Sequence, residues 1–189
     1  MRRSIWKLIV VATLVCGTLD ISLAVILTLM HGREPAAMLR FVASGPFPQA
    51  TDWGAAGSIL GLGVHYTLMA IMVSVFVLAA RNRSYLLNMP LRAGVAYGVI
   101  TYAIMNLLVV PLRFPAAWPP KPLGIATQLF AHIVLVGLPT AYITRRYLRR
   151  WGLDPAEALV VDLAAEARRR GALDERIGRL LEQLDRLAE

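Results

Sequence analysis

Four long apolar runs are the feature that most constrains how this chain can fold. They cover residues 8–30, 55–80, 93–112 and 123–144, and Asp20 is the only formally charged residue inside them. As a helix, each run reaches about 30 Å, the thickness of the hydrocarbon core of a bilayer. Because backbone polar groups must be satisfied within lipid, the runs predict an all-α polytopic membrane protein with four transmembrane helices in an antiparallel bundle.

The composition supports a membrane-embedded chain. Of the 189 residues, 57% are hydrophobic and 17% are charged, whereas a soluble domain carries about 25% charged residues. The first run follows Arg2 and Arg3 but is too long for a secretory signal, so we expect it to be a retained helix. It contains the only cysteine, Cys16, which cannot form an intrachain disulfide and is predicted to be a small core residue.

Basic residues flank the apolar runs unevenly and predict the orientation. Ten of them lie on the side that carries both termini, and four lie on the other side. By the positive-inside rule we expect both termini in the cytoplasm, with the bundle in a bacterial inner membrane. The net charge of +8 is thus interpreted as a topology signal, and nucleic acid is not an expected partner. The ten are Arg2, Arg3, Lys7, Arg81, Arg83, Arg92, Arg145, Arg146, Arg149 and Arg150, and the four are Arg33, Arg40, Arg113 and Lys121.

The segments outside the runs also carry structural signals. Residues 35–44 place apolar side chains on one helical face, which favours a helix lying in the outer interface. The proline-rich stretch Pro111–Pro122 predicts a stiff, extended outer cap, and Pro139 predicts a kink in the fourth helix. Residues 1–151 form the expected transmembrane domain.

Residues 152–189 form a second unit, predicted as a cytoplasmic amphipathic tail. They contain six arginines and nine acidic residues, a net charge of −3. Asp154-Pro155 is typical of a helix start. Gly171 is expected to interrupt the helix, with a leucine stripe at coiled-coil-like spacing after it. Such a stripe favours self-association or a protein partner through this tail.

Four polar residues inside the runs are the candidate site. Asp20, His65, Asn106 and His132 each lie in a different run, and polar groups in hydrocarbon usually face a bundle interior or a cavity. Counted along the helices, they lie about 15, 15, 9 and 14 Å below the outer boundary. We therefore predict one polar layer in the outer half of the bundle, with a ligand-binding, conducting or purely structural role.

Three binding hypotheses fit these residue types. His65 and His132 are candidate axial ligands of a b-type haem, with Gly61 leaving room for the macrocycle and Arg113 available to a propionate. Alternatively, His65, His132 and Asp20 hold a divalent metal ion. The third hypothesis is a small molecule bound by the polar layer.

Two other classes of function remain open at the level of sequence. One is a proton- or solute-conducting oligomer, for which the Gly57xxxGly61 and Gly94xxxGly98 spacings permit close helix approach. The other is an accessory or assembly subunit of a membrane complex, with a purely structural polar layer and a docking tail. The chain has no P-loop, dinucleotide fingerprint, HExxH, GxSxG or paired cysteines, so enzymatic activity is not expected.

The chain also resembles a family of uncharacterised bacterial four-helix inner-membrane proteins. The resemblance spans roughly residues 10–146 and implies that the four polar residues are recurring intramembrane positions of that family, but it implies no activity. The motifs that carry it are Gly17-Thr18-Leu19-Asp20-Ile21, Leu60-Gly61-Leu62-Gly63-Val64-His65, Met105-Asn106 before Val109-Val110-Pro111-Leu112, and His132 before Gly137-Leu138-Pro139.

Overall fold

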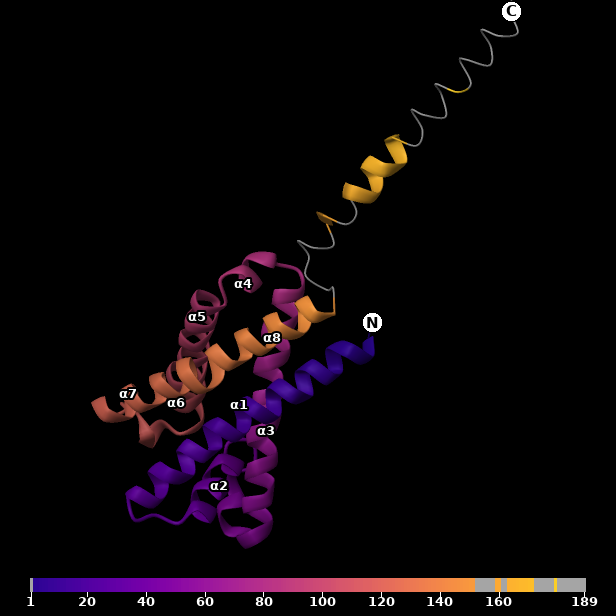
Figure 1. The fold of residues 1–189 in the computed structure, drawn as a ribbon. Coiled ribbons are helices and arrows are strands. Elements are labelled where there is room, and N and C mark those ends of the chain that lie inside the picture. The colour runs from indigo at the N-terminus through magenta and orange to yellow at the C-terminus, as the bar shows by residue number, and fades with distance from the viewer. Residues whose placement is uncertain (1, 152–158, 161–162, 172–178, 180–189) are drawn as a thin grey trace, which may run out of the picture.

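The fold is a bundle of four membrane-length helices (Figure 1). The computed structural model describes residues 2–151, 159–160, 163–171 and 179. Within these residues the backbone forms helices joined by turns. The helices long and apolar enough to cross a membrane are Ile5–Met30, Gly54–Arg81, Pro90–Arg113 and Pro122–Arg150. The prediction of an all-α polytopic membrane fold is therefore confirmed.

The first two spans are single helices, whereas the other two are composite. Helices α1 (Arg2–Met30) and α3 (Gly54–Arg81) are continuous. The third and fourth spans each contain a π-helical segment between two α-helices. Their pieces are α5 (Pro90–Tyr102), the π-helical segment Ala103–Val109, α6 (Val110–Arg113), α7 (Pro122–Phe130), the π-helical segment Ala131–Gly137 and α8 (Leu138–Arg150).

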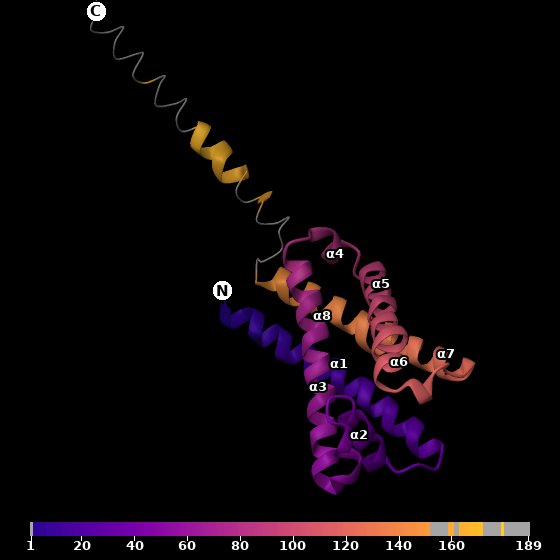
Figure 2. The ribbon, with the colours of Figure 1, turned by 180° about the vertical axis from the view of Figure 1, so that it is seen from behind.

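The bundle has two layers. Helices α1 and α8 lie side by side in one layer, and α3 and α5 cross them in the other (Figures 1 and 2). A short helix, α4 (Ser84–Asn88), joins α3 to α5 and adds Leu87 to the core. The main hydrophobic core lies near this α4 end of the bundle. Its fully buried members include Leu8, Val73, Val77 and Leu148.

Helix α2 (Pro35–Ser44) has the bounds predicted for the helix in the connection between the first and second spans, and it packs against the N-terminal half of α3. A Cβ added at Gly61 would collide with the carbonyl oxygen of Leu39 in α2. The Ser58 hydroxyl donates to the carbonyl oxygen of Ala36 at 2.9 Å. The glycine face of α3 is thus used for packing within the chain, and α2 covers it.

The proline-rich segment between the third and fourth spans is more helical than the sequence predicts. Residues Val110–Arg113 continue the third span as α6, and Pro115–Ala117 form a 3₁₀ turn. The expectation of a wholly extended Pro111–Pro122 cap was therefore wrong. Pro115 is tolerated because it opens the 3₁₀ turn, where its missing N–H costs no intrahelical hydrogen bond.

Both π-helical segments end just before a proline. Pro111 and Pro139 each occupy the second position of the helix that follows. In a regular α-helix the proline ring collides with the carbonyl four residues earlier. The wider π-helical turn relieves that collision, and such turns are frequent at functional sites. Pro139, where the sequence predicts a kink, lies two residues after the end of the π-helical segment Ala131–Gly137.

The described part of the tail is helical and exposed. Residues 163–171 are in helix, and Arg170 pairs with Glu166 at 3.3 Å. Gly171 is the last described residue of this helical stretch, and residues 172–178 after it lie outside the described part of the chain, so the interruption stays a prediction. The Asp154-Pro155 helix start and the leucine stripe from Leu173 to Leu187 lie outside the described residues.

Candidate functional site

Asp20 of α1 and His65 of α3 form the centre of the polar layer. His65 Nδ1 lies 3.9 Å from Asp20 Oδ2, and the two side chains are 10% and 22% exposed. That separation is too long for a hydrogen bond, and the two groups form an ion pair only when His65 is protonated. The structure thus brings together two of the four residues that the sequence places at equal depth.

The backbone of Gly17 orients the His65 ring. His65 Nε2 lies 2.9 Å from the Gly17 carbonyl oxygen, one turn before Asp20 on the same helix. A Cβ at Gly17 would lie 2.7 Å from a ring carbon of Tyr66, so the glycine lets α1 and α3 approach closely. The hydroxyls of Tyr66 and Thr18 form a second link between the helices at 2.8 Å. Gly17 and Thr18 of the Gly17–Ile21 motif therefore help to hold α1 and α3 together.

His132 adds a second buried imidazole from the fourth span. It lies in the π-helical segment Ala131–Gly137, is 9% exposed, and interacts electrostatically with Asp20. Its Nδ1 lies 2.9 Å from the carbonyl oxygen of Gln128, one turn earlier. The Tyr102 ring meets it edge-on at a centroid distance of 5.9 Å. Asp20 therefore lies within the electrostatic range of both imidazoles.

The backbone contacts determine which ring nitrogen carries hydrogen. A carbonyl oxygen only accepts, so Nε2 of His65 and Nδ1 of His132 must each donate. In the neutral rings this leaves Nδ1 of His65 and Nε2 of His132 as acceptors. The Asp20 carboxylate is an acceptor as well. With both rings neutral and Asp20 ionised, the layer presents three acceptor groups, and His65 Nδ1 and Asp20 Oδ2 lie 3.9 Å apart.

Asn106 is not joined to this group by any hydrogen bond among the described residues. Its Nδ2 donates to the carbonyl oxygen of Tyr102 at 3.3 Å, within its own span. It lies in the π-helical segment Ala103–Val109, which has no buried residue. The sequence places Asn106 at a similar depth, but depth does not determine the direction in which a helix presents a side chain.

A seam of small polar residues between α1 and α8 leads from this site toward the α4 end of the bundle. Cys16 Sγ lies 3.3 Å from Thr140 Oγ1 and 3.8 Å from the Val136 carbonyl oxygen. The hydroxyls of Thr13 and Thr144 are buried and find no hydrogen-bond partner among the described residues. Cys16 was predicted only as a small core residue, and the seam was not predicted. A signal was present, since Thr140 and Thr144 follow His132 at multiples of four residues.

The geometry does not favour the haem and metal hypotheses. Haem ligation through His65 Nε2 would require the ring to give up its hydrogen bond to Gly17. The space beside Gly61 is occupied by α2, and Arg113 Nε donates to the Gly45 carbonyl oxygen at 2.6 Å. Among the described residues, no three His, Cys, Asp or Glu side chains are placed to hold a metal ion. Both hypotheses stay predictions.

The fold and site define an integral, multi-pass, all-α membrane protein with an acid–imidazole layer inside the bundle. Comparisons with protein-family models, curated proteins and solved structures found no significant match. The resemblance to four-helix inner-membrane proteins therefore stays a prediction.

Proposed function

We propose that this chain is a multi-pass protein of the bacterial inner membrane that binds a small, hydrogen-bond-donating molecule at Asp20, His65 and His132. The single observation that carries the proposal is the set of three acceptors within electrostatic range. Acceptors that face one another repel unless a proton or a donor lies between them. An ammonium or hydroxyl group supplies that donor, whereas a group without N–H or O–H does not.

The proposed orientation has both termini in the cytoplasm. It is supported by the ten basic residues on the side of the termini against four on the other side. The tail then lies in the cytoplasm, and the polar layer lies nearer the outer surface. The ligand reaches the layer from the outer half of the bilayer.

Nitrogen NMR of histidine-labelled protein in lipid nanodiscs tests the site. The chain has three histidines, so His65→Gln and His132→Gln variants assign the signals, and exposed His31 is an internal reference. We expect hydrogen on Nε2 of His65 and on Nδ1 of His132. Octylamine, whose ammonium group donates hydrogen bonds, is expected to shift the signal of His65 Nδ1.

The control probe is octyltrimethylammonium, which has the same charge and chain but no N–H group. It is expected to leave the His65 signal unchanged. An equal shift with both probes would attribute the effect to charge alone and overturn the proposal. The absence of any shift with octylamine would also overturn it.

A second candidate function, a proton path, is favoured by the seam between α1 and α8. Cys16 lies one turn from Asp20, and two buried hydroxyls beyond it lack partners among the described residues. Buried hydroxyls of this kind normally bind ordered water. Hydroxyls, the thiol and water would together connect the polar layer with the α4 end of the bundle.

A Thr144→Val substitution is expected to lower proton flux severalfold in proteoliposomes, because it removes one hydroxyl from the seam with little change in side-chain size. The matched control is Thr67→Val. The Thr67 hydroxyl is exposed and donates to the Gly63 carbonyl oxygen on its own helix at 2.8 Å. Equal flux in both variants, or wild-type flux no higher than in empty liposomes, would rule out this path.

A further inference from the structure

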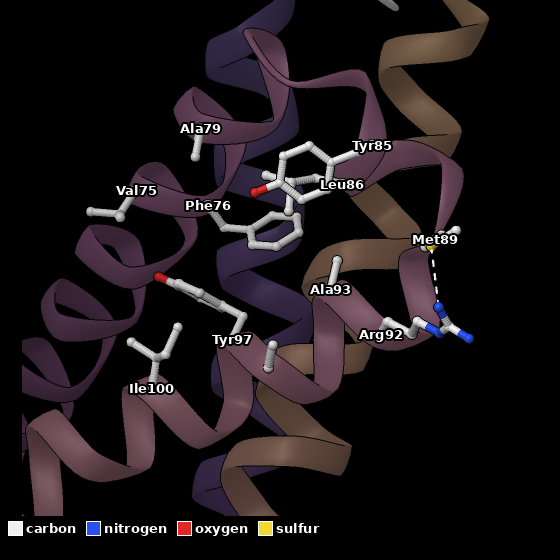
Figure 3. A pocket seen from close by; sticks show the side chains of 11 residues that line it. Val75, Phe76, Ala79, Tyr85, Leu86, Met89, Arg92, Ala93, Tyr97 and Ile100 are labelled. Atoms are coloured by element: carbon white, nitrogen blue, oxygen red, sulfur yellow. Dashed lines mark hydrogen bonds between the residues drawn. The ribbon is translucent and has the colours of Figure 1, made fainter.

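An apolar cavity lies between the second and third spans, near the α4 end of the bundle (Figure 3). Its volume is about 480 Å³, within the range typical of small-molecule sites. Helix α3 contributes Phe76, α4 contributes Leu86, and α5 contributes Ala93 and Ile100. The cavity opens toward the membrane-facing surface, where Val75 and Ile100 are more than half exposed.

The walls of this cavity suit a hydrocarbon chain. Tyr97 lines the cavity, and its hydroxyl donates to the Met72 carbonyl oxygen at 2.5 Å. The Tyr97 and Phe76 rings lie against each other with centroids 5.0 Å apart. Because the Tyr97 hydroxyl is already paired, the ring presents mainly carbon to the cavity. Burial of an occupant's apolar surface in this cavity is therefore favourable in free energy.

One cation lies at the rim. Arg92 is exposed at the start of α5, and its hydrogen bond is to the sulfur of Met89 at 3.7 Å. Sulfur is a weak acceptor, so most of the donor capacity of the guanidinium remains free. The segment from Arg81 to Arg92 has three arginines and no acidic residue. The rim therefore has unbalanced positive charge at the level where the helices leave the bilayer.

We propose that this cavity binds an anionic phospholipid, with an acyl chain between α3 and α5 and the phosphate on Arg92. Arginine forms two parallel hydrogen bonds with phosphate oxygens, and basic residues at a bilayer surface attract anionic lipids. A second copy of the transmembrane domain supplies no matching charge. Its three acidic residues, Asp20, Glu34 and Asp52, lie within the first span or in the outer loop. The assignment to the cytoplasmic leaflet rests on the proposed orientation, but lipid binding itself does not.

Native mass spectrometry of the full-length protein from nanodiscs tests this inference. The discs contain phosphatidylcholine and phosphatidylglycerol in equal amounts, and we expect the wild type to retain phosphatidylglycerol preferentially. Arg92→Gln is expected to lower that retention about fivefold, the effect of losing one basic residue beside an anionic surface. The matched control is Arg146→Gln, which removes an exposed arginine of α8 outside this cavity.

Ala96→Phe tests the acyl-chain half of the proposal. Ala96 lines the cavity, so a phenyl ring fills it without changing the charge of the rim. Retention is expected to fall here as well. Phosphatidylglycerol with a photoreactive acyl chain provides a second readout in the unmodified protein, with expected crosslinks at Val75 and Ile100. Equal losses in both arginine variants, or crosslinks only outside the cavity, would overturn the proposal. These measurements do not involve the polar layer. A failure of the proposed ligand site at the polar layer can therefore be distinguished from a failure of the lipid-binding proposal.

Discussion

A Gly98→Ala substitution is expected to destabilise the folded bundle by about 3 kcal/mol. The added Cβ would lie 2.5 Å from the Cα of Ile133 and 2.6 Å from the carbonyl oxygen of His132. Both are backbone atoms of the fourth span, so no side-chain rotation relieves the collision. The third and fourth spans must separate, or the π-helical segment that holds His132 must shift.

Unfolding in mixed micelles measures the effect, and Gly63→Ala is its matched control. Gly63 is also in the middle of a membrane-spanning helix, but nothing lies within 4 Å of its Cβ position. Alanine is favoured over glycine inside a helix by roughly 0.5–1 kcal/mol, so this variant is expected to be slightly more stable than the wild type. Similar stabilities of the two alanine variants would show that the contact between the third and fourth spans is looser than the structure has it.

Replacing His65 with leucine is expected to lower the free energy of unfolding by about 1–3 kcal/mol, the usual cost of leaving a buried polar group without its hydrogen-bond partner. The substitution leaves the Gly17 carbonyl oxygen without its imidazole donor. Leucine fills much of the space of the ring, so the loss reports mainly on polar contacts.

The same change in an Asp20→Asn background is expected to cost more, because the introduced amide can donate a hydrogen bond to His65 Nδ1 that leucine then removes. A double-mutant cycle measures the difference, with an expected coupling of about 1–2 kcal/mol. Strictly additive effects would mean that Asp20 and His65 do not interact. As a control, His31→Leu removes an exposed histidine whose Nδ1 contacts the Leu27 carbonyl oxygen, and its effect on stability is expected to be small.

Much of the site was predictable from depth alone. The sequence predicts Asp20 and His65 at equal depth in the bilayer, and the structure brings them to 3.9 Å. Asn106 shows the limit of that reasoning, because its described hydrogen bond stays within its own span. The number of residues along a helix gives depth, but rotation about the helix axis depends on how neighbouring helices pack.

Glycine spacing shows a similar limit. The Gly94xxxGly98 spacing predicts a close helix approach but does not identify the partner. The structure pairs this face with the fourth span at Gly137, and it pairs the Gly57xxxGly61 face with α2. Neither surface is left open for an oligomer contact of the kind that the conducting hypothesis invokes. The partner of a small-residue face is selected by connection lengths and by the shapes of all the helices together.

The number of membrane spans, their approximate bounds and the identity of the costly polar groups were determined by the sequence itself. Hydrocarbon imposes its requirements on each segment separately, so local composition is sufficient for these features. The tertiary structure alone decided that His65 donates to Gly17, that the seam connects Cys16 with Thr140, and that a cavity lies between α3 and α5. These features depend on contacts between residues far apart in the chain, and such contacts form only when the helices adopt their particular rotations and crossings.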